Sequence, residues 1–307
     1  MTSAVVFAYH DVGVRCLSVL LDRGVDVRLV VTHDDDPSES IWFASVAALA
    51  RARGIPVAAP RDPNAPEFVA RVAAAAPDFL FSFYYRHMLS RALLVIPTRG
   101  AYNMHGSLLP RYRGRVPINW AIIHGETETG ATLHAMTEKP DNGAIVVQKA
   151  VPIGPDDTAR EVFERVTAAA GEALDAALPA LVAGTAPHFA QDRALASYFG
   201  GRRPEDGRID FAWPARRIHD FVRALTRPYP GAFAEVGGTR LNFWRTRRTA
   251  GAAPPRAAAV LGVADGAILL ECRDGGTLEV TDLEIGGRAV QAGDFAAAAG
   301  GSRIVLA

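Results

Sequence analysis

The first half of the chain alternates short apolar runs with longer stretches in which apolar residues recur at helical spacing. A short apolar run is typical of a buried strand, and apolar residues three or four apart indicate one face of a helix. Strands that alternate with helices predict an α/β fold with a doubly wound, mostly parallel sheet. The expected strands cover residues 5–9, 27–32, 79–83, 102–105 and 131–136, and the expected helices cover residues 16–21, 41–53 and 66–76.

A long helix is expected in the middle of the chain. Thr158 and Glu161 have the spacing of a capping box, in which each side chain bonds the backbone N–H of the other residue at the start of a helix. Apolar residues at helical spacing then continue over residues 162–178. We expect Pro179 to kink or split this helix and Gly184 to end it.

The pattern changes in the last third of the chain. Residues 199–207 are polar and rich in turn-forming residues, which predicts a linker, and residues 216–224 predict a helix. Short β-like runs separated by Gly and Pro follow, which predicts a small, barrel-like β domain. The Ala/Pro/Gly-rich residues 250–259 predict a flexible loop. The β-like runs cover residues 232–236, 240–244, 267–272, 277–285 and 303–306.

Composition adds limits to this picture. A length of 307 residues allows two domains, which we expect at residues 1–203 and 204–307. Hydrophobic residues make up 49% and charged residues 21%, which argues against a disordered or fibrous chain. Lys+Arg and Asp+Glu are each 33, so the chain has no basic excess with which to hold a long nucleic acid. We therefore expect no nucleic-acid partner.

Targeting signals and cysteines favour the cytoplasm. The apolar run near the N-terminus is short and lacks the basic start of a signal peptide. No stretch approaches the ~18 apolar residues of a membrane span, so no membrane association is expected. Cys16 and Cys272 match no metal-binding motif, and a chain of this size needs no disulfide.

The densest group of polar residues follows the fourth expected strand. Asn103 and His105 lie two apart, so their side chains share one face of that strand, and Asp141 follows the next strand. An amide can donate to an oxyanion, an imidazole can move a proton near neutral pH, and a carboxylate can orient the imidazole. These residues suit acyl transfer. An Asn at a strand end is also typical of a turn, and a lone His is also typical of a partly buried core.

Other common chemistries find no match in the chain. There is no Gly-x-Ser-x-Gly motif, and Ser107 lies in a loop without a second base, which favours direct attack by a substrate amine over a covalent enzyme intermediate. The remaining histidines show no metal-ligand spacing, so no metal is expected. The first strand is followed by residues 10–13, His-Asp-Val-Gly, rather than Gly-x-Gly-x-x-Gly, so no dinucleotide cofactor is expected.

One motif gives a specific resemblance. Residues 103–110 read Asn-x-His-x-Ser-Leu-Leu-Pro and residues 141–143 read Asp-x-Gly, and in this combination the chain resembles the folate-dependent formyltransferase family. Further segments are most similar to the formyltransferase domain of the bifunctional UDP-4-amino-4-deoxy-L-arabinose enzymes, here without their dehydrogenase/decarboxylase domain. These segments cover residues 5–11, 81–87, 105–115, 125–134, 199–206 and 230–233.

The resemblance implies a Rossmann-like catalytic domain followed by a small OB-like β-barrel domain. It implies transfer of a formyl group from the co-substrate 10-formyltetrahydrofolate to the 4-amine of UDP-4-amino-4-deoxy-L-arabinose, a step in lipid A modification and polymyxin resistance. It also makes His105 the general acid/base, Asn103 the group that stabilises the transition state, and Asp141 the support of His105. The implied folate contacts are His87, Met88, Leu89, Arg115, Thr137, Glu138, Lys139, Pro140 and Asp141.

The acceptor half is less defined by the sequence. Arg202 and Arg203 are candidates for contact with a diphosphate and Tyr229 for stacking on a base, with solvated arginines and a turn-forming tyrosine as the alternatives. The similar bifunctional enzymes continue into an oxidative domain, so we expect a separate dehydrogenase/decarboxylase polypeptide to catalyse that step. The alternative functions are a methionyl-tRNA formyltransferase, an N-formyltransferase for another nucleotide-linked amino sugar, and a folate-binding regulator without catalysis.

Overall fold

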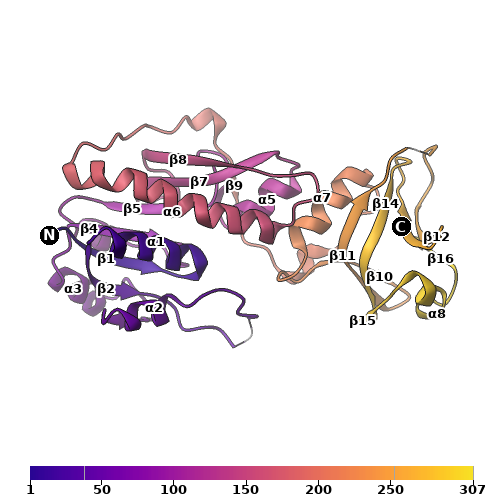
Figure 1. Ribbon diagram of the computed structural model, residues 1–307, viewed down its shortest axis with the longest axis horizontal. Coiled ribbons are helices and arrows are strands. Elements are labelled where there is room, and N and C mark those ends of the chain that lie inside the picture. The colour runs from indigo at the N-terminus through magenta and orange to yellow at the C-terminus, as the bar shows by residue number, and fades with distance from the viewer. Residues whose placement is uncertain (38, 252, 307) are drawn as a thin grey trace. The chain divides into compact units, whose positions relative to one another are not determined.

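The computed structural model describes residues 1–37, 39–251 and 253–306. They form two compact units, whose elements Figure 1 labels in chain order. The chain passes between the units more than once, because each unit contains more than one segment. Unit 1 comprises Met1–Pro117, Glu128–Pro152 and Phe163–Gly200, and unit 2 comprises Ile118–Thr127, Ile153–Val162 and Gly201–Ala307.

Unit 1 is built on a seven-stranded sheet with the order β3-β2-β1-β4-β5-β7-β8. The neighbours from β3 to β5 pair in parallel, whereas β7 and β8 add antiparallel strands. The mostly parallel α/β sheet predicted from the sequence is therefore confirmed. The strands of this sheet are β1 Ser3–Ala8, β2 Asp26–Val31, β3 Val57–Ala58, β4 Phe79–Phe83, β5 Ala101–His105, β7 Glu128–Ala135 and β8 Ile145–Pro152. The short strands β6 Arg113–Gly114 and β9 Tyr198–Phe199 pair separately.

Helices cover both faces of this sheet, because its central strands are apolar on both sides. On one face, Phe68 of α3 and Leu93 of α4 pack in one apolar cluster with Phe7 of β1. On the other face, Gly13 of α1 lies against Ala8 at the end of β1. The helices of unit 1 are α1 His10–Asp22, α2 Val46–Ala52, α3 Pro66–Ala74, α4 Arg91–Leu94 and α6 Ala159–Ala183, whose first four residues belong to unit 2, with the 3-10 turn η1 Arg193–Leu195.

α2 is shorter than its sequence pattern indicates. The helix expected from residue 41 begins at Val46, so that part of the prediction is wrong. The physical reason is a cap: the side chain of Ser45 accepts a hydrogen bond from the N–H of Ala48 at 3.2 Å, which satisfies a free donor of the first turn.

The start and end of α6 follow the prediction, but its interior does not. The capping box forms, since Glu161 accepts from the N–H of Thr158 at 2.7 Å and Thr158 accepts from the N–H of Glu161 at 3.4 Å. Pro179 does not split the helix, because α6 continues to Ala183. A proline one turn from the end disrupts few of the hydrogen bonds in a helix of 25 residues. Gly184 then ends it with a positive φ of 73°.

By length and composition, α6 is the helix among the described residues that could cross a membrane. Half of its most apolar window is buried inside the protein. Ion pairs join it to neighbouring elements, since Asp175 binds Arg23, the residue after α1, at 2.6 Å and Glu172 binds Lys149 of β8. These contacts describe a helix packed on the sheet of unit 1.

Unit 2 contains the small β domain that the sequence predicts. Its antiparallel strands run in the order β10-β11-β14-β13-β12-β16 and form a nearly closed barrel, with β15 beside β14. Of the loop expected at residues 250–259, residue 252 lies outside the described residues and Ala259 begins β12. The strands are β10 Ala232–Val236, β11 Thr239–Arg248, β12 Ala259–Ala264, β13 Ala267–Glu271, β14 Thr277–Ile285, β15 Arg288–Ala289 and β16 Arg303–Leu306. The helices are α5 Pro117–Ile123, which begins at the end of unit 1, α7 Ala215–Leu225 and α8 Phe295–Ala299, with the turns η2 Pro204–Gly207 and η3 Ala292–Asp294.

Candidate active site

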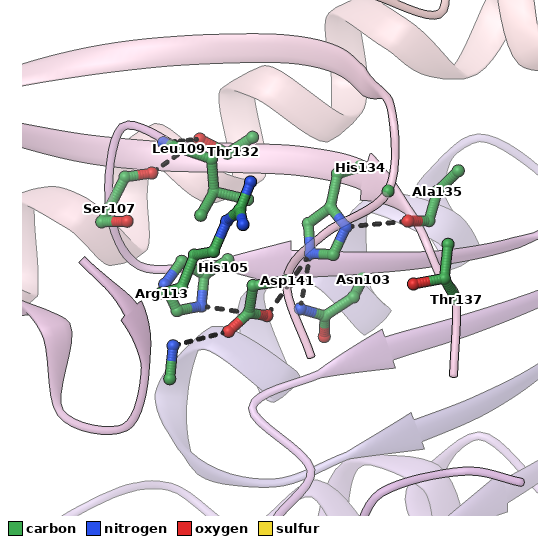
Figure 2. A network of polar contacts seen from close by, with 12 residues as sticks. Asn103, His105, Ser107, Leu109, Arg113, Thr132, His134, Ala135, Thr137 and Asp141 are labelled. Atoms are coloured by element: carbon green, nitrogen blue, oxygen red, sulfur yellow. Dashed lines mark hydrogen bonds and ion pairs between the residues drawn. The ribbon is translucent and has the colours of Figure 1, made fainter. Parts of the chain in front are cut away.

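β5 presents two polar residues of the predicted motif at the end of a buried strand (Figure 2). Asn103 and His105 alternate with the buried Met104, so both side chains project from one side of the strand. His105 is 6% exposed, and Asn103 is half-buried. Backbone pairing with β4 on one side and β7 on the other fixes the positions of both residues.

Asp141 comes to the same place from the loop between β7 and β8. Its backbone has a positive φ of 51°, which a residue other than glycine adopts rarely. Neighbouring groups hold this conformation. The N–H of Gly114 donates to Oδ2 of Asp141 at 2.8 Å, and Nε2 of Gln191 donates to the carbonyl oxygens of Asp141 and Gly143 at 2.9 and 2.7 Å. Such enforced backbone strain is found most often at functional positions.

His105 and Asp141 form a pair whose geometry suits proton transfer. Oδ1 of Asp141 lies 3.5 Å from Nδ1 of His105 (Figure 2). Nε2 of the same ring lies 2.8 Å from the carbonyl oxygen of Tyr112, and because a carbonyl only accepts, Nε2 carries a proton. Protonation of Nδ1 would give an imidazolium that faces the carboxylate. The pair can therefore take up a proton and release it.

His134 completes the network, although the sequence analysis assigned it no role. It is 2% exposed and lies opposite Asn103 in the antiparallel pairing of β5 with β7. Its Nδ1 donates to the carbonyl oxygen of Ala135 at 2.9 Å, so its Nε2 accepts from Nδ2 of Asn103 at 3.1 Å. This Nε2 also lies 3.6 Å from Oδ1 of Asp141. The alternation of residues along β7 indicates which side chains share a face with His134. Placing His134 beside Asn103 also requires the register between β5 and β7.

The charge state of Asp141 follows from opposing effects. Burial favours the neutral acid, because its side chain is 12% exposed. The charge of His105 and the N–H of Gly114 oppose burial, and the pKa of Asp141 is held well below its usual value. The carboxylate is therefore ionised at neutral pH and stabilises positive charge on the ring of His105.

The loop that follows His105 is held by buried hydroxyl groups. Oγ1 of Thr132 donates to the carbonyl oxygen of Ser107 at 2.6 Å and accepts from the N–H of Leu109 at 3.2 Å. The hydroxyl of Ser107 donates to the carbonyl oxygen of Arg111 at 2.7 Å, and Ser107 is fully buried. An inward-facing hydroxyl with this partner is a structural group rather than a nucleophile, in agreement with direct attack by a substrate.

The three residues predicted after β4 differ in accessibility. The side chain of Met88 is 51% exposed, whereas that of Leu89 is 2% exposed and belongs to the apolar core of unit 1. Nδ2 of Asn64 donates to the carbonyl oxygen of Met88 at 3.0 Å. His87 lies edge-on to His33, with ring centroids 5.0 Å apart. A ligand could meet the side chains of His87 and Met88, but at Leu89 it could meet only the backbone.

The remaining predicted folate contacts lie in exposed segments. Residues Thr137, Glu138, Lys139 and Pro140 are all exposed and lead directly from β7 to Asp141. Oγ1 of Thr137 donates to the carbonyl oxygen of Lys139 at 2.9 Å, which closes a local turn. The side chain of Arg115 is exposed, while its N–H donates to the carbonyl oxygen of Phe199 at 3.0 Å.

The residues considered for the acceptor belong to unit 2, whereas Asn103, His105 and Asp141 belong to unit 1. The guanidinium of Arg202 stacks over the ring of Trp120 at 4.8 Å. The side chain of Arg203 is exposed, and burial raises the pKa of Tyr229 to about 12.

Metal ligands form no cluster in the part of the chain that the structure describes, where no three His, Cys, Asp or Glu side chains come together. Cys16 and Cys272 are both buried and unpaired.

Comparison with known proteins shows to which family the chain belongs. The formyl transferase family model matches residues 11–178, and the model of the formyl transferase C-terminal domain matches residues 202–300. Together these matches cover most of the chain. The chain belongs to the formyl transferase family. The N-terminal match includes the polar network of β5, and the C-terminal match includes most of the barrel of unit 2.

Solved structures share the fold of this formyl transferase. The N-formyltransferase from Helicobacter canadensis, solved with folinic acid and dTDP-3-aminofucose, is 19% identical with a TM-score of 0.72 over 91% of this chain and 99% of that one. WlaRD, a sugar 3N-formyl transferase solved with dTDP and 5-N-formyl-THF, is 16% identical with a TM-score of 0.68 over 91% and 97%. HypX from Aquifex aeolicus, in complex with tetrahydrofolic acid, is 18% identical with a TM-score of 0.62 over 91% and 43%.

Proposed function

We propose that this formyl transferase moves the formyl group of 10-formyltetrahydrofolate to a nucleotide-linked amino sugar, with the 4-amine of UDP-4-amino-4-deoxy-L-arabinose as the acceptor. The network of Asn103, His105 and Asp141 carries the proposal, because it supplies an oxyanion donor and a proton carrier in one place. The folates and dTDP-3-aminofucose in the structures of relatives support the donor and the class of acceptor. The sequence segments that resemble the UDP-4-amino-4-deoxy-L-arabinose enzymes support this UDP-linked sugar as the acceptor.

The first step makes the new bond. The acceptor arrives as a neutral amine, and its lone pair attacks the formyl carbon of the donor to form a C–N bond. The electron pair of the carbonyl moves to the oxygen. Asn103 donates from Nδ2, and His105 presents positive charge balanced by Asp141, so both stabilise this oxyanion. Each well-placed donor lowers the barrier by roughly 3–4 kcal/mol.

The second step breaks the bond to the folate. The oxyanion re-forms the carbonyl, and the electron pair of the old C–N bond passes to N10 of the folate. N10 gains one proton and the sugar nitrogen loses one, so the protons balance. His105 carries this proton, directly or through one water, and Asp141 holds the ring in place while its charge changes. The products are an N-formyl sugar and tetrahydrofolate.

The exposed segments around the network provide the donor site in this proposal. His87, Met88 and Arg115 offer side chains to the folate, and the turn over residues 137–140 offers backbone and side-chain groups beside Asp141. Leu89 contributes through its backbone, since its side chain is in the core.

In this account the two domains of the chain have different roles. Residues 1–203 form the catalytic domain, and residues 204–307 form the OB-like domain. We place the enzyme in the cytoplasm and its product in lipid A modification and polymyxin resistance.

A competition assay tests the acceptor. The enzyme is given 10-formyltetrahydrofolate and equal amounts of UDP-4-amino-4-deoxy-L-arabinose, dTDP-3-aminofucose and methionyl-tRNA, and the products are separated by mass spectrometry. We expect formylation of the UDP sugar at the highest kcat/KM. Preferential formylation of the dTDP sugar would show that UDP-4-amino-4-deoxy-L-arabinose is the wrong acceptor, but it would still support a nucleotide-linked amino sugar. Formylation of the tRNA alone would overturn the amino-sugar assignment.

A further inference from the structure

Residues 189–199 form a strap that is fixed at both ends to the elements around the polar network. At its start, the backbones of Phe189 and Ile145 exchange two hydrogen bonds of 2.8 Å. At its end, β9 pairs with β6, and the carbonyl oxygen of Ser197 accepts from the N–H of Arg113 at 2.9 Å. The strap therefore runs between the start of β8 and the loop that follows β5.

Gln191 lies in the strap between these fixed ends, and its amide has partners on both sides. Nε and Nη2 of Arg113 donate to its Oε1 at 3.1 and 2.6 Å. Its Nε2 donates to the carbonyl oxygens of Asp141 and Gly143 at 2.9 and 2.7 Å. Because a guanidinium only donates and a carbonyl only accepts, these partners allow one orientation of the amide. Arg113 therefore fixes which end of Gln191 faces the loop that carries Asp141.

The loop that carries Arg113 also contacts both members of the proposed acid–base pair. The carbonyl oxygen of Tyr112 accepts from Nε2 of His105 at 2.8 Å, and the N–H of Gly114 donates to Oδ2 of Asp141 at 2.8 Å. Arg113 lies between these two residues and joins the same loop to the strap. The separation of 3.5 Å between the ring of His105 and the carboxylate of Asp141 therefore depends on a closed ring of contacts.

The backbone of Asp141 is the strained member of this ring of contacts. Its positive φ is rare for a residue other than glycine and persists only where the surrounding structure holds it. Gln191 supplies two of the hydrogen bonds that do so, at Asp141 and at Gly143. We propose that Arg113 and Gln191 are positioning residues, which hold the carboxylate of Asp141 against His105 during formyl transfer. This inference rests on the proposed function, in which Asp141 supports His105 and neither positioning residue touches a substrate.

Formyl transfer to UDP-4-amino-4-deoxy-L-arabinose at saturating 10-formyltetrahydrofolate tests the role in the reaction. Gln191→Met keeps the length of the side chain but loses its amide, and we expect kcat to fall at least roughly tenfold. Gln191→Glu still accepts from Arg113 but turns a carboxylate oxygen toward two carbonyl oxygens. Its kcat should fall even where the ion pair with Arg113 preserves the melting temperature, which a merely structural role does not predict. Gln291→Met is the matched control, because Gln291 is an exposed glutamine of unit 2, and it should keep the wild-type kcat.

A double-mutant cycle with Asp141→Asn separates positioning from a general loss of stability. If Gln191 acts through Asp141, Gln191→Met should lower kcat less than about twofold once Asp141 is already replaced. An undiminished loss in that background, or the wild-type kcat in Gln191→Met alone, would overturn the proposal. Arg113→Met should reproduce the effect of Gln191→Met, with Arg193→Met as its control, because Arg193 is an exposed arginine of the same strap.

Hydrogen exchange followed by NMR gives a second test that needs no acceptor. The N–H of Gly114 bonds to Oδ2 of Asp141, so its exchange should accelerate at least roughly tenfold in Gln191→Met. The buried amides of β4 should keep their wild-type rates, and equal acceleration there would replace positioning with general destabilisation. Unchanged exchange at Gly114 would also overturn the proposal. Faster exchange at Gly114 in an enzyme that does not formylate the UDP sugar would support the placement of Asp141 and count against the proposed function instead.

Discussion

At the scale of single residues, the proposed active site depends on partners that come from different segments of the chain. β5 supplies Asn103 and His105, β7 supplies His134, and the following loop supplies Asp141. Each polar group has a partner that fixes its orientation, so little rearrangement is needed when charge develops on the substrate. This is the physical basis for assigning acyl transfer to the network.

His134 is a positioning residue in this account. His134→Leu removes the acceptor of the Asn103 amide, so we expect kcat to fall roughly tenfold, less than the ~10²–10³-fold loss for Asn103→Ala. The KM for the folate should change little, because His134 is buried beneath the network. Steady-state kinetics measure both constants. His134→Gln, which restores an oxygen acceptor, should recover part of kcat, and an equally inactive Gln variant would argue for a purely structural role.

Asp141 makes stability depend on pH in a defined direction. Its pKa in the folded chain lies below the value of about 3.9 expected when unfolded, so below that pH the unfolded chain binds the proton more readily. Its contribution to stability is therefore fully present at neutral pH and is lost as the pH falls through the folded pKa. Urea unfolding at about pH 6 and about pH 3 should show a larger loss for the wild type than for Asp141→Asn. Equal losses would contradict the ionised, stabilised carboxylate.

The proximity of Asn103, His105 and Asp141 could be predicted from the sequence, because the first two share one face of a strand and Asp141 follows the next strand. His134 could not, because its role depends on a cross-strand register. Leu89 shows the converse limit. The family resemblance implies a folate contact at Leu89, whereas the packing of unit 1 buries its side chain.

At the scale of elements, the loop from β7 to β8 determines where Asp141 lies. Gly143 is required there, since a Cβ at this position would lie 1.8 Å from the carbonyl oxygen of Ala135, a backbone atom with little freedom to move. Gly143→Ala should shift the loop and lower kcat/KM by roughly 10²-fold, the effect of a displacement of about 1 Å in an active site. Gly200→Ala is the control, because nothing lies within 4 Å of its Cβ position. Similar kinetics for the two variants would show that the loop does not position Asp141.

The strands that sequence patterns predicted are either buried along their whole length, as β4 is, or alternate between buried and exposed positions, as β14 does. β4 and β14 match their expected bounds because their hydrophobic patterns are strong. β8 has no such pattern, since it is the edge strand of the sheet and Gln148, Lys149 and Ala150 are exposed. Hydrophobic patterns and local motifs also do not determine whether a helix continues past a proline, as α6 does past Pro179.

At the scale of the whole molecule, periodicity predicted the fold class. The alternation of strands and helices indicates the sheet of unit 1, and the Gly- and Pro-separated runs indicate the barrel of unit 2. The antiparallel addition of β7 and β8 did not follow from periodicity, because strand direction depends on how the connections cross the sheet.

The balanced charge of the chain predicts weak contact with nucleic acid. With 33 basic and 33 acidic residues, the enzyme has no net attraction for a polyanion. A gel shift with methionyl-tRNA at physiological ionic strength should show little binding. Tight, salt-sensitive binding would indicate a clustered basic face and would favour the tRNA reaction.

The central claim is that His105, supported by Asp141, carries the proton in formyl transfer from the folate to an amino sugar. The most direct measurement is the rate of tetrahydrofolate release when UDP-4-amino-4-deoxy-L-arabinose is added to the wild type and to His105→Ala, each loaded with 10-formyltetrahydrofolate. We predict rapid, acceptor-dependent release by the wild type and a loss of at least about 10²-fold in the variant, with its fold intact by circular dichroism. Release by the variant at the wild-type rate would contradict the account.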